Sequence, residues 1–173
     1  GGHTLASPAL NNGGSDVFVA KLSANGASLL WLAWMGGALD EQANAIVLDK
    51  SSVSEPKVYL TGITASPTFP VAGPAMQACS PNTGTLAFVA ELSQPGNVPN
   101  LVYSTCWGGV SGTLGNSGNA IAVDSLGAAY VTGTTFASNF PISVGIPAPY
   151  NTMGAASQAA FVVGRACPRT GHC

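Results

Sequence analysis

The stretch DVFVAKL at residues 16–22 recurs as LAFVAEL at 86–92 and, in altered form, as AAFVVGR at 159–165. Other segments recur between these copies in a fixed order, at intervals of roughly seventy residues. They are MGG (35–37) and WGG (107–109), NAIVLD (44–49) and NAIAVD (119–124), and VYLTG (58–62) and AYVTG (129–133). Segments that recur in one order indicate a tandem array of a single supersecondary unit.

Each repeat divides into four short apolar runs separated by Gly, Pro, Asn or Ser, which predicts four β-strands. In the complete repeat, strands one to four are expected at 44–49, 58–63, 86–92 and 101–107. The predicted fold class is therefore all-β, with tandem four-stranded antiparallel blades of a β-propeller. A β-solenoid is the alternative, but its coils are nearer to roughly 20 to 30 residues in length.

The predicted strands amount to about two blades and an incomplete ring, because a closed ring needs roughly four to eight. Residues 1–173 form one propeller-type repeat region, which divides into a partial blade at 16–35, a full blade at 43–107, a partial blade at 118–165 and a C-terminal tail at 166–173. Soluble proteins avoid open sheet edges. We therefore expect completion either by neighbouring blades of a longer chain or by self-association, as a ring of about three or four subunits or as a filament.

The composition suits short strands and turns rather than helices. Only 7% of the 173 residues are charged, and the chain holds 22 Gly and 12 Pro. A net charge of −2 with five basic residues argues against nucleic acid as a partner. No apolar run approaches the roughly 18 to 20 residues of a membrane span, so we expect no membrane insertion.

Four cysteines permit two disulfides. Cys79 lies in the loop after strand two, and Cys106 lies near the end of strand four. These strand ends share one rim of an up-and-down blade, so a bond between them is expected to tether the loop. Cys167 and Cys173 are candidates for a small terminal loop, with free thiols as the alternative. Disulfides and a low charge content indicate a secreted or cell-surface protein.

The repeated motifs closely resemble the bacterial β-propeller repeat family abbreviated SBBP. The resemblance rests on FVAKL (18–22), GNAIAVD (118–124), AYVTGTT (129–135) and the LVYST…GG strand that begins at residue 101. It spans residues 8–165 and implies secreted or surface-exposed bacterial proteins built from propeller blades. It implies no activity, because the family carries no catalytic signature. The last copy departs from the pattern, since it ends in Gly164–Arg165 rather than a charged residue followed by Leu.

The acidic residues offer two interpretations. Asp49 and Asp124 end equivalent strands, where Asp commonly starts a turn by accepting backbone N–H bonds; a metal-ligand role is the alternative. Asp40 and Glu41 form an adjacent pair that could bind Ca²⁺ with loop carbonyls. The second repeat has no acid at the corresponding place, which favours a solvated turn.

No catalytic, cofactor or metal site is predicted. His3 and His172 lie near the two ends of the chain, and no central His is available for a Ser–His–Asp triad or a Cys–His pair. The group of Cys167, His172 and Cys173 matches no zinc spacing and supplies only three ligands. We expect a non-enzymatic protein without cofactors.

Strand four of the first repeat is apolar on both faces, in contrast to its counterpart. Leu32 and Ala33 replace Ser104 and Thr105. An outer strand normally shows one face to water, so this strand is expected to be covered by the N-terminal segment or by another subunit or partner. The interface candidates are Trp31, Leu32 and Trp34.

These observations favour a structural, assembly or adhesion scaffold that self-associates or belongs to a longer propeller. The alternative is a module that recognises a glycan or peptide through rim loops. Its candidate stacking residues are Phe69, Trp107, Phe140 and Tyr150.

Overall fold

Short antiparallel strands make up most of the computed structural model, which describes residues 3–4, 13–51, 56–79, 84–109, 114–141 and 159–164. The strands are β1 (His3–Thr4), β2 (Val17–Leu22), β3 (Leu29–Met35), β4 (Glu41–Asp49), β5 (Lys57–Thr64), β6 (Leu86–Ser93), β7 (Asn100–Trp107), β8 (Asn116–Val123), β9 (Ala129–Thr135) and β10 (Ala159–Gly164). A 3-10 turn, η1 (Pro95–Asn97), connects β6 to β7. The predicted all-β class is confirmed, and each predicted strand is present.

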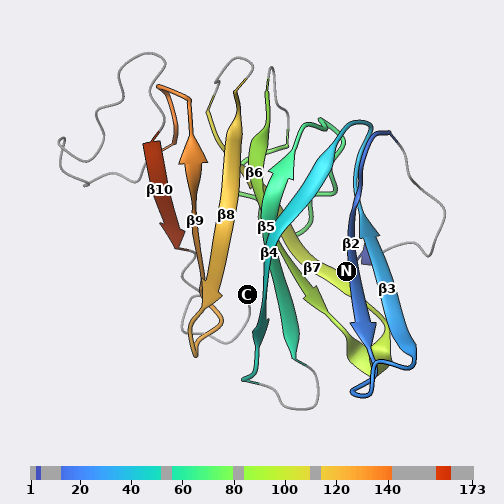
Figure 1. Cartoon of the computed structure of the whole chain (residues 1–173). Helices are drawn as coiled ribbons and strands as arrows, with labels where there is room; N and C mark the ends of the chain where they lie inside the picture. The colour runs from blue at the N-terminus through green and yellow to red at the C-terminus, as the bar shows by residue number, and fades with distance from the viewer. Residues whose placement is uncertain are drawn as a thin grey trace.

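The strands form three separate antiparallel sheets, none of them closed within the described residues (Figure 1). The central sheet has the order β1-β7-β6-β5-β4, in which β4 to β7 run as a four-stranded meander. The C-terminal sheet has the order β10-β9-β8, and the N-terminal sheet consists of β2 and β3. The short strand β1, which the sequence did not predict, pairs with β7 at the outer edge of the central sheet.

The sheets lie side by side in chain order (Figure 1). A cluster of buried hydrophobic residues fills each of the two gaps between them. Alternate side chains of a strand point to opposite faces. We call the face toward the preceding sheet the N-side face and the face toward the following sheet the C-side face. The N-side face of the central sheet packs on the C-side face of β2 and β3. The C-side face of the central sheet packs on β8 and β9.

The internal repeat extends to the irregularities of the strands. A bulge falls between Ala43 and Ala45 of β4 and again between Gly118 and Ala120 of β8. Another falls after Lys21 in β2 and after Glu91 in β6. Because bulges shift which residues face each other, their recurrence at equivalent positions fixes a residue-by-residue correspondence between the sheets.

A buried polar cluster anchors the start of the first strand in both repeats. The Glu41 carboxylate accepts hydrogen bonds from the Gly37 N–H (2.7 Å) and the Thr64 hydroxyl (2.7 Å). At the equivalent place, the Thr135 hydroxyl donates to Asn116 Oδ1 (2.6 Å). The Nδ2 group of the same Asn116 side chain donates to the Gly109 carbonyl. The solvated turn predicted for Glu41 is therefore wrong, because burial with two donors satisfies this carboxylate.

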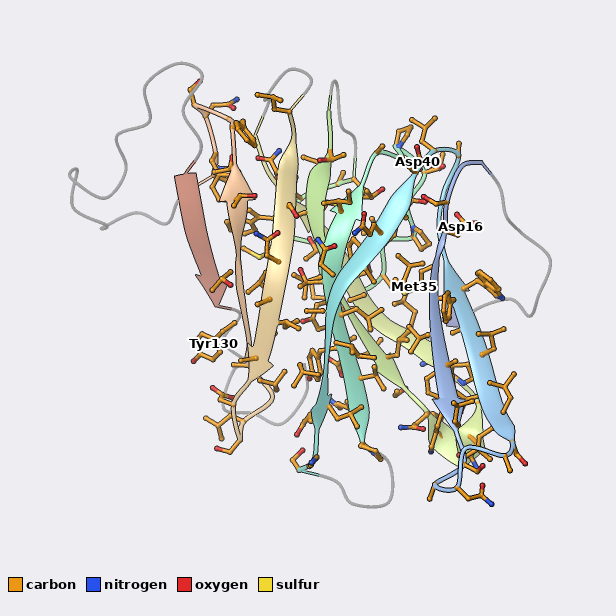
Figure 2. All side chains as sticks on the ribbon, viewed as in Figure 1. Asp16, Met35, Asp40 and Tyr130 are labelled. Atoms are coloured by element: carbon orange, nitrogen blue, oxygen red, sulfur yellow. A yellow bond between two sulfur atoms is a disulfide. The ribbon has the colours of Figure 1, made fainter. Side chains whose placement is uncertain are left out.

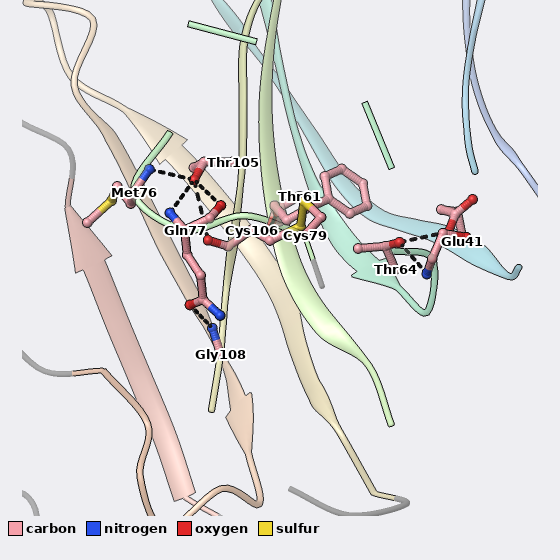
Figure 3. The surroundings of a disulfide bond; sticks show 11 residues. Glu41, Thr61, Thr64, Met76, Gln77, Cys79, Thr105, Cys106 and Gly108 are labelled. Atoms are coloured by element: carbon pink, nitrogen blue, oxygen red, sulfur yellow. Dashed lines mark hydrogen bonds between the residues drawn. A yellow bond between two sulfur atoms is a disulfide. The ribbon is translucent and has the colours of Figure 1, made fainter. Parts of the chain in front are cut away.

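The disulfide predicted between Cys79 and Cys106 is present, with 5.1 Å between the two Cα atoms (Figure 3). It fastens the loop that follows β5 against the outer strand β7. Thr105 Oγ1 holds the same loop by accepting hydrogen bonds from the N–H groups of Met76 (2.9 Å) and Gln77 (3.3 Å). The predicted partners Cys167 and Cys173 lie outside the described residues.

Candidate functional site

The N-side face of the N-terminal sheet is an exposed apolar surface. Antiparallel pairing places Phe18 beside Trp34, Ala20 beside Leu32 and Leu22 beside Leu29. Phe18 is 61% exposed, and its ring lies 5.8 Å from that of Trp34. Leu22, Leu29 and Trp34 are exposed as well. We call the set Phe18, Leu22, Leu29, Leu32 and Trp34 the N-terminal apolar face.

Each cross-strand pair of this surface has a buried counterpart in the central sheet. The counterparts are Phe88 with Cys106, Ala90 with Ser104, and Leu92 with Leu101. Phe88 is 0% exposed, and the other five are also fully buried, most of them in the core shared with β2 and β3. The repeat therefore uses this face to pack against a preceding sheet, and in the N-terminal sheet the face has no such cover among the described residues.

The edge strand β4 presents a second exposed apolar surface on the N-side face of the central sheet. Ile46 is 59% exposed and Leu48 is exposed as well. Their equivalents Ile121 and Val123 pack against the core between the central and C-terminal sheets. β2 and β3 occupy positions three and four of the repeat, so no described strand stands at positions one and two to cover Ile46 and Leu48.

The C-side face of the C-terminal sheet is the opposite open end. Tyr130 is 46% exposed and points away from the central sheet (Figure 2). Met35 of the N-terminal sheet, by contrast, is buried in the gap between β4 and β2. The equivalent Tyr59 is 1% exposed beneath β8 and β9. Thr132 is exposed where its equivalent Thr61 is fully buried. Both ends of the array thus carry residues that are buried between sheets elsewhere in the chain.

The three interface candidates from the sequence separate onto two faces. Leu32 and Trp34 belong to the N-terminal apolar face. Trp31 instead lies in the chain's own core, where its indole N–H donates to Gln94 Oε1 (3.0 Å). The sequence analysis did not identify Phe18, Ile46 and Leu48 as surface residues. Alternation along a strand shows which side chains share a face, but it does not show which face lacks a neighbouring sheet.

The rim aromatics proposed as glycan-stacking residues mostly pack within the chain. Phe69 is buried, with its ring 4.8 Å from that of Phe88. Trp107 and Phe140 have ring centroids 6.1 Å apart. Tyr150 lies outside the described residues. Phe69 is therefore a core residue rather than an exposed platform.

A buried charged group lies between the central and C-terminal sheets. Glu91 is fully buried and pairs with Lys57 (Nζ to Oε1, 2.9 Å). The Tyr59 hydroxyl donates to the Gly127 carbonyl (3.3 Å). Burial, aided by the nearby Glu91 carboxylate, raises the pKa of Tyr59 well above its ordinary value. The arrangement keeps the phenol protonated and ties the two sheets together.

The turn-starting role predicted for Asp49 and Asp124 is confirmed. Asp49 Oδ1 accepts the Ser51 N–H (2.8 Å). Asp124 Oδ1 accepts the N–H groups of Ala128 (2.9 Å) and Leu126 (2.9 Å), and these bonds lower the pKa of Asp124. Asp40 is exposed and accepts the Ser15 N–H (2.8 Å). Across the described residues, no group of three His, Cys, Asp or Glu side chains could hold a metal ion.

No protein-family model and no curated protein matches the chain, so the SBBP resemblance stays a prediction from its motifs. In the part of the chain that the structure describes, no helix has the length and apolar character needed to span a membrane.

Proposed function

We propose that this chain is a non-enzymatic, propeller-type module that acts as a secreted or cell-surface scaffold for assembly or adhesion. In this proposal the three sheets are blades, of which the central one is complete. The open ends then bind further blades, either in other copies of the chain or in a longer polypeptide. The Cys79–Cys106 disulfide supports an oxidising location.

The observation that carries the proposal is the contrast between Phe18 and Phe88. They occupy the same position of the repeat, yet the first is 61% exposed and the second is completely buried. The same contrast holds for Leu22 and Leu92 and for Leu29 and Leu101. Contiguous exposed apolar surface of this kind marks an interaction site.

Apolar burial alone would give a weak association. Burying the exposed half of each large side chain in the N-terminal apolar face contributes roughly 1 kcal/mol. The four exposed members, Phe18, Leu22, Leu29 and Trp34, together give roughly 4 kcal/mol, which is at the lower end of the about 4–15 kcal/mol that association costs. A stable contact therefore needs more burial, and the exposed side chains of Ile46, Leu48 and Tyr130 on the other open faces can supply it.

The test is the native mass of the purified chain, measured by light scattering after size exclusion at several concentrations. We expect multiples of 17.2 kDa for the natural chain. Trp34→Ser should return it to a monomer, whereas the control Leu126→Ser, at an exposed turn residue outside these faces, should not. A natural chain that stays monomeric at every concentration would refute self-association.

A further inference from the structure

The described strands include one more at position three of the repeat than at any other position. β2, β6 and β10 all stand at position three, since each carries the recurring Phe–Val motif. Positions one, two and four are each filled twice, by β4 and β8, by β5 and β9, and by β3 and β7. A head-to-tail assembly that joins β8 and β9 of one copy to β2 and β3 of another would complete a blade and leave β10 without a place.

We propose that β2 of a second copy pairs with β9 in place of β10, so that β10 is an intramolecular cap on the assembly edge. This inference rests on the proposed function and names the partner as a second copy of the chain. The edge of β9 is now occupied by β10 along Ala159–Gly164. The edge of β2 opposite β3 has no partner among the described strands.

The register of the exchanged pair follows from the two pairs already present. Gly62 of β5 faces Phe88 of β6, and Gly133 of β9 faces Phe161 of β10. Both glycines thus stand opposite the Phe of the motif. In the exchange Gly133 would face Phe18 of the second copy, and Tyr130 would face Lys21, as Tyr59 faces Glu91 in the central sheet.

Residue chemistry favours β2 over β10 at this edge. β10 places Gly164, which has no side chain, opposite Tyr130. β2 would place Lys21 there, whose ammonium also donates to Gln94 Oε1 (2.7 Å) and Asn97 Oδ1 (3.1 Å) of its own chain. The Tyr130 hydroxyl already donates to Asp124 Oδ2 (3.2 Å). An opposite charge near Asp124 is favourable at this partly exposed site. β2 also matches the motif of β6 more closely, since both read FVA followed by a charged residue and Leu.

The exchange would also cover the exposed surfaces at both ends together. The N-terminal apolar face of the second copy would lie against the C-side face of β6 and β7 in the first. The exposed side of β8 and β9, with Tyr130 and Thr132, would lie over Ile46 and Leu48 of the second copy. These are the contacts that the repeat makes between adjacent sheets within one chain.

The test is disulfide cross-linking between two full-length variants, Lys21→Cys and Tyr130→Cys, mixed in equal amounts. Both carry Cys167→Ser and Cys173→Ser, so that no other thiol competes. Cross-strand neighbours have Cβ atoms close enough for a disulfide, whereas residues two positions further along do not. We expect a cross-linked dimer from this mixture and several-fold less from Lys21→Cys with Thr132→Cys, an exposed residue on the same face of β9.

A further variant examines the capping role of β10. Val162→Pro, added to the Tyr130→Cys chain, weakens β10 because proline removes an N–H and does not fit a paired strand. It should raise the cross-linking yield several-fold. Absence of a cross-link even with Val162→Pro, or equal yields at Tyr130 and Thr132, would overturn the inference. If light scattering still shows multimers, self-association survives without this exchange; if the chain is monomeric at every concentration, both the exchange and self-association fail, and the open ends are left to bind blades of a longer polypeptide.

Discussion

Removal of the Cys79–Cys106 disulfide should substantially lower the free energy of unfolding. The bond closes a loop with a sequence separation of 27 residues. The chain-entropy relation gives a stabilisation of about 3.5 kcal/mol for a loop of this length, through restriction of the unfolded chain. Since a domain of this size is stable by about 5–15 kcal/mol, the double variant Cys79→Ala, Cys106→Ala should lose a large part of its stability.

Urea unfolding followed by circular dichroism measures this loss, with both proteins in non-reducing buffer. The matched control is Thr105→Val, which keeps the disulfide and removes the hydroxyl that holds Met76 and Gln77. We expect the control to lose about 1–2 kcal/mol. If the cysteine variant lost no more than the control, the loop-closure reasoning would be refuted, and the loop would be held by its hydrogen bonds.

Three further expectations follow from the buried contacts. Thr64→Val leaves one oxygen of the Glu41 carboxylate without its donor, and should cost about 2–3 kcal/mol in urea unfolding, whereas Thr64→Ser should retain most of the stability. Gly62→Ala places a methyl group against the Gln42 carbonyl, and should cost about 1–3 kcal/mol or shift the β4–β5 register, which amide exchange would detect. Because the pKa of Tyr59 is raised, the unfolded chain loses the phenol proton first, above about pH 10, and stability should then fall by up to about 1.4 kcal/mol per pH unit; Tyr59→Phe should flatten this alkaline slope in urea midpoints.

The sequence predicted the strands closely because the repeat supplied each one at least twice. β5, β6 and β7 begin and end within one residue of the predicted ranges 58–63, 86–92 and 101–107. β4 begins at Glu41, three residues ahead of the predicted start at Asn44. The bulge beside Asn44 breaks the alternation there, and a charged residue is a poor sequence signal for a buried strand end.

The assignment of faces could not be read from the sequence. Trp31 and Trp34 lie on opposite sides of β3, but alternation does not reveal which side meets the central sheet. Glu41 begins β4 and Thr64 ends β5, so their buried hydrogen bond joins residues that lie 23 positions apart in the sequence. The equivalent hydrogen bond joins Asn116 and Thr135, so a threonine hydroxyl donates to a side-chain oxygen in both repeats. Because Glu41 in one repeat is replaced by Asn116 in the other, comparison of the motifs does not reveal that these two positions are equivalent.

The two ends of the array differ in a way that bears on how assembly would be controlled. Natural proteins protect open sheet edges with charged side chains, proline or a covering segment. β2 carries a single charged side chain, Lys21, while its N-side face is apolar from Phe18 to Leu22. The edge of β9 is instead covered by β10, a strand at the same position of the repeat as β2.

In the proposed exchange, a contact between copies gains the β2–β9 pairing but loses the β9–β10 pairing, so the backbone hydrogen bonds gained and lost nearly cancel. The net driving force then comes from the apolar side chains that β10 does not cover, which makes the N-terminal apolar face the determinant of association and β10 the determinant of its rate.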